Sequence, residues 1–340
     1  MAFTMSFALC FYQKRIAMKK IIISRKGFDS GSGGCPSPIL PDGRLRSLPI
    51  PEHKENEKKC REGMAYSGIY PDHEYTTGDI IKSLHSLGKT RTEAGEVAHL
   101  DPDIDRESLP DEWRKPGWRG VFGQSDAALG HLENQEISPG DLFLFFGLFR
   151  ETVGDIKNLK FDEKKSEKHV IWGWLQVDDI IRFPWNKPMT PEDEKKLHKN
   201  PWCKYHPHVL NKAIYESEKK DNAIYIAEEK LELGIQEIDD RKLNGYGVFP
   251  EYNKALQLTE GEKLCEWQLP TLFRENLTYH KAEGKWRCKE DTDYVMLDMG
   301  RTTRWQEGIA DIKDKEGKDW VGIVKWLQDI FSYAKKGSGQ

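Results

Sequence analysis

The stretch of sequence that decides the fold lies at residues 142–150 and reads LFLFFGLFR. Its nearly unbroken apolar run is typical of a β-strand that is buried on both faces. A turn sequence, SPGD at residues 138–141, comes directly before it. After a polar excursion at residues 151–168, the segment 169–177 returns as HVIWGWLQV. The two apolar runs therefore predict a β-hairpin in the middle of the chain.

Shorter elements surround this hairpin, and strands and helices mix without a fixed period. Further strands are expected at residues 19–26, 44–50, 223–227, 245–249, 255–259 and 294–297. Helices are expected at residues 80–87, 125–134, 190–200 and 320–333. This mixture favours an α+β fold, in which helices and long ordered loops surround a mixed or antiparallel sheet or a partly closed barrel. Neither GxGxxG nor GxxxxGK(S/T) occurs, so Rossmann and P-loop folds have no support.

One domain is expected over residues 18–303, with a C-terminal helical segment, residues 304–335, packed on it. Residues 1–17 are interpreted as a leader outside the fold, because their positive charges follow the apolar stretch Phe3–Tyr12 instead of preceding it. That order is wrong for a secretory signal, and the stretch is too short to span a bilayer. Residues 336–340 include a Gly-Ser-Gly sequence and are expected to form a flexible tail.

The composition restricts the classes of partner. The 340 residues carry a formal net charge of −4, which argues against sequence-independent wrapping of a phosphate backbone, since that requires a basic surface. A local basic pocket for one nucleotide stays compatible with this charge. No run of about 18 apolar residues occurs, so no membrane partner is expected. The six cysteines show no CxxC spacing, so a zinc ribbon or thioredoxin-type motif is not expected. The length and charge of the chain and the missing secretion signal favour a reduced, cytoplasmic protein.

The loop after the first expected strand is the first candidate site. Glycines at positions 27, 31, 33 and 34 would let backbone N–H groups approach an anion closely. Neighbouring side chains add charge and hydrogen-bond donors, and the predicted ligand-binding residues here are Ser24, Arg25, Lys26 and Ser30. Asp29 and Cys35 are predicted as a catalytic base and nucleophile. The alternative interpretation is a flexible hairpin loop with solvated charges.

A second candidate site is the sequence HLDPDID at residues 99–105. Alternate carboxylates on an extended segment point to one side, so Asp101, Asp103 and Asp105 together could bind Mg²⁺ or Ca²⁺. The pattern departs from an EF-hand loop, because Arg106 stands where that loop requires glycine. An Asx-turn that caps local backbone groups is the preferred interpretation. Asp101 and Asp103 are predicted as catalytic acid–base residues, and no residue is assigned as a metal ligand.

A third candidate is His206-Pro207-His208, which lies near Cys203 and His198 in the sequence. Two histidines that stand two residues apart on an extended segment can face one metal ion. No third and fourth ligand follows at a regular spacing, so a surface loop is the preferred interpretation here.

The aromatic hairpin is the fourth candidate. Rings at alternate positions can stack nucleobases, and amide or guanidinium groups at strand ends can read a base edge. The rings concerned are Phe143, Phe145, Trp172 and Trp174. Trp174, Gln176 and Arg150 are predicted to bind a ligand, and Gln124 is added because it lies beside a glycine and can line a pocket. The alternative interpretation is that the alternating rings are core packing.

Several segments resemble a known family. Residues 20–30, KIIISRKGFDS, with residues 33–39, GGCPSPI, resemble the opening of the bacterial and phage family called nucleotide modification associated domain, third group. Three later segments resemble it too, at residues 140–147, 169–177 and 267–270. The likeness covers roughly residues 18–300. It implies a role with nucleotides in DNA-base modification systems, but it implies no particular reaction and assigns no catalytic residue or cofactor.

A weaker likeness connects the hairpin to barrels of the PUA, ASCH and EVE type, which bind RNA or modified bases. Three hypotheses follow. The first is a protein of a DNA modification system that binds a nucleotide or nucleic-acid base and processes it. The alternatives are a non-catalytic PUA-like reader of a modified base, and a partner subunit of modification enzymes. The expected partners are a nucleotide or base, DNA and other modification proteins, while enzymatic activity and any cofactor stay open.

Overall fold

The structure is a computed structural model. It describes residues 18–52, 64–235, 238, 243–260, 263–279, 285–288, 293–298, 307–312 and 317–334. The predicted leader and the predicted flexible tail lie outside these residues. The α+β class is confirmed, because a large mixed sheet is combined with helices on its flanks.

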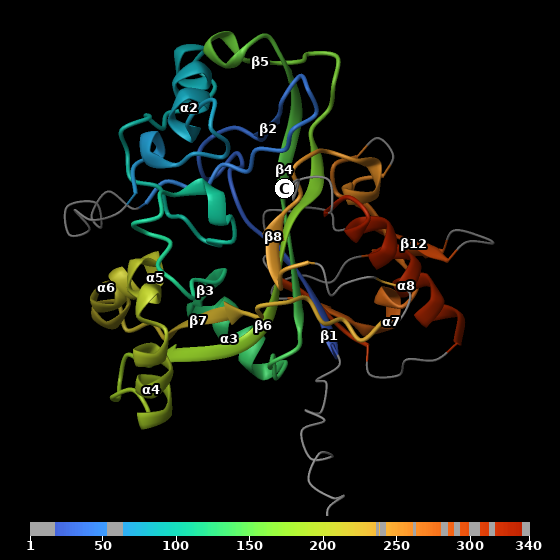
Figure 1. The fold of residues 1–340 in the computed structure, drawn as a ribbon. Helices are drawn as coiled ribbons and strands as arrows, with labels where there is room; N and C mark the ends of the chain where they lie inside the picture. Colours follow the sequence, from blue (N-terminus) through green and yellow to red (C-terminus); the bar gives the residue numbers. More distant parts are fainter. Residues whose placement is uncertain are drawn as a thin grey trace, which may run out of the picture.

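The predicted hairpin forms the middle of the main sheet. Strand β4 (Leu142–Val153) pairs antiparallel with β6 (Lys168–Phe183), and both strands are longer than the apolar runs that predicted them. Strand β1 (Lys20–Arg25) lies parallel to β4, with Ile22 opposite Phe143. Residues 142–149 are all buried, as expected for a strand that is covered on both faces. These three strands therefore form the centre of the main sheet, and the loops that carry the predicted site residues connect to them (Figure 1).

The remaining strands extend the main sheet on both sides of these three strands. The sheet runs in the order β10-β13-β1-β4-β6-β7-β3, while β2 and β5 pair with β4 and β8 pairs with β6. A second sheet has the order β11-β12-β9. The bounds are β2 Ser37–Ile39, β3 Val121–Ser125, β5 Lys160–Phe161, β7 Asn222–Ala227, β8 Tyr246–Val248, β9 Glu266–Pro270, β10 Leu277–Tyr279, β11 Lys285–Cys288, β12 Tyr294–Asp298 and β13 Glu307–Asp311.

Helices cover both flanks of the central strands. In the view of Figure 1, α7 and α8 lie to the right of β4 and β6, while α4, α5 and α6 lie to the lower left. The helices are α2 Thr77–Ser86, α3 Asp126–Asn134, α4 Pro191–Lys199, α5 Pro207–Leu210, α6 Lys212–Ser217, α7 Phe273–Asn276 and α8 Gly317–Phe331. None of the helices in the described residues is long and apolar enough to cross a membrane.

The main core is aromatic and lies against the hairpin. The ring of Phe122, on β3, meets Phe143 and Phe145 edge-on, with centroid distances of 4.9 and 5.2 Å. Burial of each such ring contributes about 1.5–3 kcal/mol, which explains why the alternating rings of β4 are packing and not a free surface. A second apolar cluster lies beneath α2 and includes Phe28, Tyr66 and Ile80.

Two predicted strands are wrong. Residues 44–50 form only isolated bridges, because Ser37–Ile39 occupies the neighbouring edge of β4. Residues 255–259 begin in a 3₁₀ turn that Asn253 caps by accepting the Ala255 N–H, and only the end of this segment pairs. The sheet itself is mixed and is not closed into a barrel.

The sheet nevertheless curls strongly. Gln124 on β3 donates a hydrogen bond of 2.6 Å to Glu307 on β13, although the two strands stand near opposite ends of the strand order. The Lys26 ammonium, just after β1, lies 4.4 Å from the centre of the Phe122 ring on β3. The curl therefore carries β3 across the end of β1, where the polar residues of several loops meet.

Candidate functional site

The buried carboxylate of Asp101 is the centre of this polar region. Its Oδ1 accepts the Gly123 N–H at 2.6 Å, and its Oδ2 lies 3.3 Å from the Lys26 ammonium. Burial alone would raise the pKa of Asp101, but Lys26, His206 and His208 outweigh this effect and hold that pKa well below its usual range. Asp101 is therefore a permanently ionised group in the interior.

Two histidines approach the same carboxylate. One nitrogen each of His99 and His208 and one carboxylate oxygen of Asp101 all lie within 4.8 Å of one another. The Nε2 atom of His208 is 3.9 Å from Asp101 Oδ2. Burial lowers the pKa of His208 to about 3, so its ring is neutral at ordinary pH. A neutral imidazole is the form that binds metal ions.

Hydrogen bonds on the outer side of both rings fix their orientation. His99 Nδ1 lies 2.9 Å from Glu52 Oε2, and His208 Nδ1 lies 2.6 Å from Asn222 Oδ1. The Asn222 amide donates to the backbone carbonyl of His208 at 2.7 Å, so its oxygen must face the ring. Because both outer partners accept, the neutral form of each ring carries its hydrogen on Nδ1 and its lone pair on Nε2.

His206 has the opposite arrangement. Its Nδ1 accepts the backbone N–H of His208 at 3.3 Å, so the hydrogen of this ring is on Nε2. That Nε2 lies 3.3 Å from Asp101 Oδ1, although the contact does not have the geometry of a regular hydrogen bond. His206 therefore faces the carboxylate as a donor and helps to hold it in place, whereas His99 and His208 offer lone pairs.

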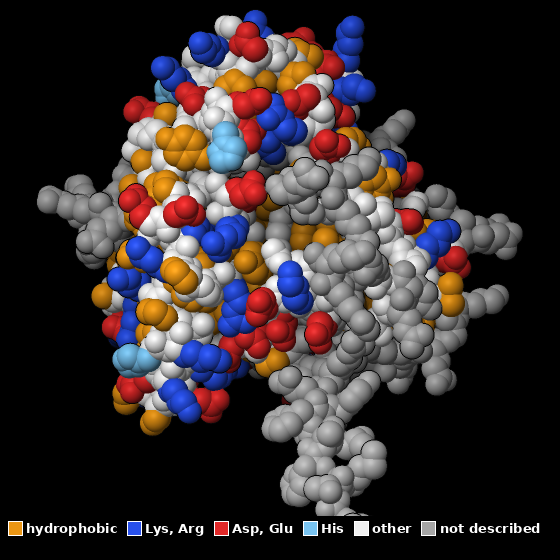
Figure 2. Space-filling model, viewed as in Figure 1, with side chains coloured by type: hydrophobic (Ala, Val, Ile, Leu, Met, Phe, Trp, Pro, Cys, Tyr) orange, Lys and Arg blue, Asp and Glu red, His pale blue; other side chains and the backbone are white. Residues whose placement is uncertain are grey.

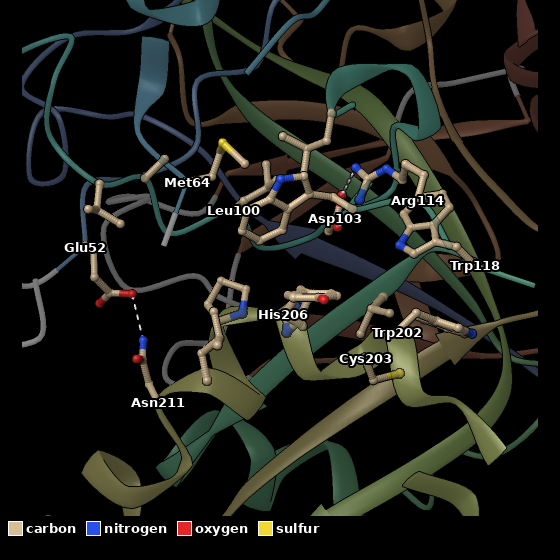
Figure 3. Close-up of a pocket in the computed structure, with 18 residues that line it drawn as sticks. Glu52, Met64, Leu100, Asp103, Arg114, Trp118, Trp202, Cys203, His206 and Asn211 are labelled. Carbon is tan, nitrogen blue, oxygen red and sulfur yellow. Dashed lines mark hydrogen bonds and ion pairs between the residues drawn. The ribbon is translucent and has the colours of Figure 1, made fainter. Parts of the chain in front are cut away.

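Close packing fixes these groups further. An added Cβ at Gly123 would lie 2.2 Å from the His208 ring, so only glycine fits beside this imidazole. Glu52, which orients His99, also accepts a hydrogen bond of 3.0 Å from Asn211, and Figure 3 shows the amide of Asn211 facing this carboxylate. The cavity drawn there holds about 30 Å³, enough for one or two waters beside His206.

A second buried carboxyl lies beyond Lys26. Glu307 stands opposite Ser24 in the pairing of β1 with β13, and its Oε1 accepts the bond from Gln124. Burial raises the pKa of Glu307 to about 7, although Lys26, Ser24 and Gln124 oppose this shift. The predicted ligand-binding residues Ser24, Lys26 and Gln124 thus lie together, at the inner edge of the sheet and next to Asp101.

The other residues of the opening loop face elsewhere. Arg25 pairs with Asp29 at 2.5 Å, and the remaining oxygen of Asp29 accepts the N–H groups of Gly31 and Ser32, each at 2.7 Å. The side chain of Asp29 is thus used to close its own loop, and Ser30 is exposed. Cys35 is buried, which raises the pKa of its thiol to about 12. The catalytic roles of Asp29 and Cys35 stay predictions that this arrangement does not favour.

The three aspartates of residues 101–105 do not share one site. Asp103 forms a bidentate ion pair with Arg114, at 2.6 and 2.8 Å, and Figure 3 shows the two facing each other. Asp105 is half-buried and caps the next 3₁₀ turn by accepting the Glu107 N–H. Burial raises the pKa of Asp105 to about 6. Only Asp101 points toward the histidines.

The structure also places the ligand-binding residues predicted on the hairpin. The amide of Gln176 is bonded to the backbone of Gly140 and Glu232, and Arg150 donates to the Asp162 carbonyl on the polar excursion. Neither residue contacts the Asp101 region in any described interaction. Trp174 is buried and donates to the Asn244 carbonyl at 3.0 Å, and its ring lines a groove.

This groove has a volume of about 330 Å³, within the range of small-molecule sites. Residues 100–108 line one part of it, and aromatic residues of β6 and the β8 region line another. His99, Asp101 and His208 together form what we call the histidine cluster. Asp101 also belongs to the lining of the groove, so the groove reaches the carboxylate of this cluster. The aromatic lining residues are Trp172, Trp174, Tyr246 and Phe249.

The sequence singled out two of the three residues of the histidine cluster, Asp101 and His208, but not the cluster itself. Asp101, His206 and His208 were noted in two separate candidate sites, and Lys26 in a third. His99 was quoted without a role, although its spacing of two from Asp101 on an extended segment places both side chains on one side. Glu52 and Asn222 carried no signal, because each acts only through its contact with a distant ring.

Comparison with known proteins identifies one family. A family model described as nucleotide modification associated domain 3 matches residues 20–308, from β1 to the start of β13. No curated protein and no solved structure matches the chain. The matched range contains every residue of the histidine cluster as well as Lys26 and Glu307. The chain therefore belongs to the nucleotide modification associated domain 3 family, whose name connects it with nucleotide and DNA modification systems.

Proposed function

We propose that this protein is a metal-dependent enzyme that acts on a nucleotide or nucleic-acid base in a DNA modification system, with a divalent transition metal held by His99, Asp101 and His208. One observation carries the proposal. Glu52 and Asn222 each bind the Nδ1 of one imidazole, and one nitrogen of each ring lies within 4.8 Å of an oxygen of the same buried carboxylate. Metal-binding histidines are held in this way by an acceptor on their second nitrogen.

The donor set suits a particular class of ion. Two imidazole nitrogens and one carboxylate oxygen fit Zn²⁺, Fe²⁺ or Mn²⁺ better than Ca²⁺ or Mg²⁺, which prefer oxygen ligands throughout. Three protein ligands leave a position open for water or substrate, as catalytic sites do. A metal bound there would activate water or polarise a substrate oxygen. Lys26, next to Asp101, would place a positive charge beside that oxygen.

Metal content of the full chain tests the ligand set. The protein is incubated with Zn²⁺, with Mn²⁺ or, under anaerobic conditions, with Fe²⁺, and is then dialysed. The amount of bound metal per chain is measured by inductively coupled plasma mass spectrometry. We expect about one ion per wild-type chain and almost none for His99→Gln or Asp101→Asn. Glu52→Gln should weaken binding roughly 10–100-fold, because it disturbs only the orientation of His99. His198→Gln, on the exposed face of α4, is the matched control and should bind like wild type.

Nucleoside analysis tests the enzymatic part. Cells that carry the modification system are grown with the wild-type protein or with Asp101→Asn, and the nucleosides of their DNA are compared by mass spectrometry. We expect a modified nucleoside, or its precursor, to change in amount between the two strains. Asp29→Ala and Cys35→Ser in the same assay test the predicted roles of the opening loop. Identical profiles for the wild type and Asp101→Asn would leave the metal site without a part in modification.

A non-catalytic reader of a modified base is the second candidate, and the aromatic groove is the observation that favours it. A reader would bind its base through this groove whether or not the histidine cluster is intact. The sheet is not closed into a barrel, so the likeness of the hairpin to PUA-type barrels adds no support. Base binding that survives in Asp101→Asn, with no change in any nucleoside, would favour the reader over the enzyme.

A further inference from the structure

The geometry points to a nucleotide as the occupant of the groove beside Asp101. We infer that a nucleobase lies along the aromatic wall, that the Asp105 carboxylate accepts a hydrogen bond from an amino group on its edge, and that Arg106 binds its phosphate. This inference rests on the proposed function only in that Asp101 belongs to both the groove and the histidine cluster.

The shape and the wall of the groove fit a single base. A volume of about 330 Å³ accommodates a small ligand but not a duplex. Trp172, Tyr246 and Phe249 line the groove but expose only 7%, 8% and 1% of their surface, so a base would meet the edges of rings whose positions are fixed before it arrives. Contact with these ring edges removes apolar surface of the base from water, which contributes about 25 cal/mol per Å².

Asp105 supplies a hydrogen-bond acceptor in this groove. One of its oxygens accepts the Glu107 N–H at 3.1 Å, and within the described parts of the chain its carboxyl forms no ion pair. Arg114 lies near but is bound through both nitrogens to Asp103. A carboxylate in this position suits the exocyclic amino group of cytosine or adenine, because such groups donate to Asp and Glu.

Arg106 supplies the cation at the same site. Its side chain is exposed and lines the groove, and the described residues offer it no carboxylate within ion-pair distance. Arg46 also lines the groove, but Asp72 and Tyr75 engage its guanidinium at 2.7 Å each. Arg106 is therefore the groove cation that is ready to bind a phosphate, and guanidinium groups bind phosphate through paired hydrogen bonds.

The surface argues for a nucleotide or an extruded base instead of a long duplex. On the face of the molecule that Figure 2 shows, acidic and basic side chains are interspersed over the described residues, without a continuous basic track. The net charge of −4 agrees with this view. Duplex binding gains its affinity from many phosphate contacts, whereas an enzyme that works on one base needs mainly a pocket for it.

Binding of nucleotides to the full chain tests the inference. Fluorescence of the tryptophans, or calorimetry, is followed as deoxycytidine, deoxyadenosine and thymidine monophosphates are added. We expect the two amino-bearing nucleotides to bind about tenfold more tightly than the thymidine compound, and Asp105→Leu, which has no acceptor, to remove this preference. Arg106→Gln should weaken all three about tenfold and bring each close to its nucleoside. Asp111→Asn and Arg91→Gln, both exposed and outside the groove, are the matched controls.

The pH gives a second readout, for which deoxycytidine is used because it has no titrating phosphate. Burial raises the pKa of Asp105 to about 6, and the charged groups that face it are Arg114, Glu107 and Asp103. The carboxylate that accepts the amino group forms as pH rises through this value, so binding should strengthen between about pH 5 and about pH 7. Asp105→Asn should show no such change.

The metal variants separate this inference from the proposed function. His99→Gln should lose the metal and keep nucleotide binding, because His99 does not line the groove. Nucleotide binding without any metal would leave the groove assignment standing and remove the enzyme proposal. No binding of any nucleotide at millimolar concentration, or an equal loss in the control variants, would overturn the groove assignment whatever the metal content.

Discussion

At the scale of single residues, His169 and Glu307 show how burial changes ionisation in opposite directions. His169 lies on β6, and its Nδ1 accepts a hydrogen bond of 3.0 Å from the indole of Trp267. Burial lowers the pKa of His169 to about 3, while burial raises the pKa of Glu307 to about 7. Both side chains are therefore mainly or partly uncharged near neutral pH, and each links folding to pH with its own sign.

The stability that His169 contributes should fall in acid. Its folded pKa lies below the value near 6.5 of an unfolded histidine, so its contribution is complete above pH 6.5 and is lost as pH falls toward 3. The loss amounts to about 1.4 kcal/mol per pH unit. Urea unfolding between about pH 7.5 and about pH 4.5 should show His169→Gln less stable than wild type at the upper end and progressively closer to it below. A constant difference would show that this ring does not titrate with folding.

Glu307 should act in the other direction. Its folded pKa is raised above the unfolded value of 4.5, so its contribution is complete below pH 4.5 and is lost as pH rises toward 7. Glu307→Gln keeps the bond from Gln124 but cannot ionise. We expect this variant to gain roughly 3 kcal/mol relative to wild type between about pH 4.5 and about pH 7.5, as measured by urea unfolding. An unchanged difference across this range would mean that the carboxyl is solvated in the native state.

At the scale of elements, the sequence predicts single strands and helices from local patterns better than it predicts which distant strands pair with each other. The hairpin of β4 and β6 could be predicted because both apolar runs and the turn before them are local signals. Helix α2 was likewise visible from its residues, since the end of a helix is set by side chains within one turn. The pairing of β1 with β4 and β13 could not be read, because many strands of equal composition could occupy those positions.

The capping box of α2 allows a test at this scale. Thr76 accepts the Asp79 N–H through its side chain at 3.1 Å, and the Asp79 carboxylate accepts the Thr76 N–H at 2.9 Å. Removal of the hydroxyl in Thr76→Ala should lower the free energy of unfolding by about 1 kcal/mol. Lys82→Ala, at an exposed position of the same helix, should change it by less than about 0.5 kcal/mol. Equal effects of both substitutions in urea titrations would argue against the cap.

At the scale of the whole molecule, the site joins segments that no local pattern could connect. Spacing showed that His206 and His208, or Asp101 and Asp103, could share a side, but it could not show which loops meet. Residue type alone was also not enough to predict the roles of Asp29 and Cys35. The carboxylate of Asp29 is used in hydrogen bonds that close its own loop, and burial raises the pKa of the Cys35 thiol. The family was recognisable from sequence because its match extends over residues 20–308.

Metal binding should be visible in the stability of the whole chain. An ion that binds only the folded state, at about one hundred times its dissociation constant, adds about 2.7 kcal/mol to the free energy of unfolding. Scanning calorimetry of the wild type with Zn²⁺ should therefore show a rise of several degrees in the melting temperature, reversed by a chelator. His99→Gln should show almost no rise. An equal rise in both proteins would mean that Zn²⁺ binds somewhere other than the histidine cluster.

The glycine at position 123 has a wider consequence. A Cβ there would lie 2.2 Å from the His208 ring, so that imidazole is clamped between the backbone of β3 and the side chain of Asn222. A ring held on both sides cannot swing aside to admit an ion or turn back after its departure. The proposed metal site is therefore already formed without an ion, and binding of an ion there should leave the conformation of the surrounding chain unchanged.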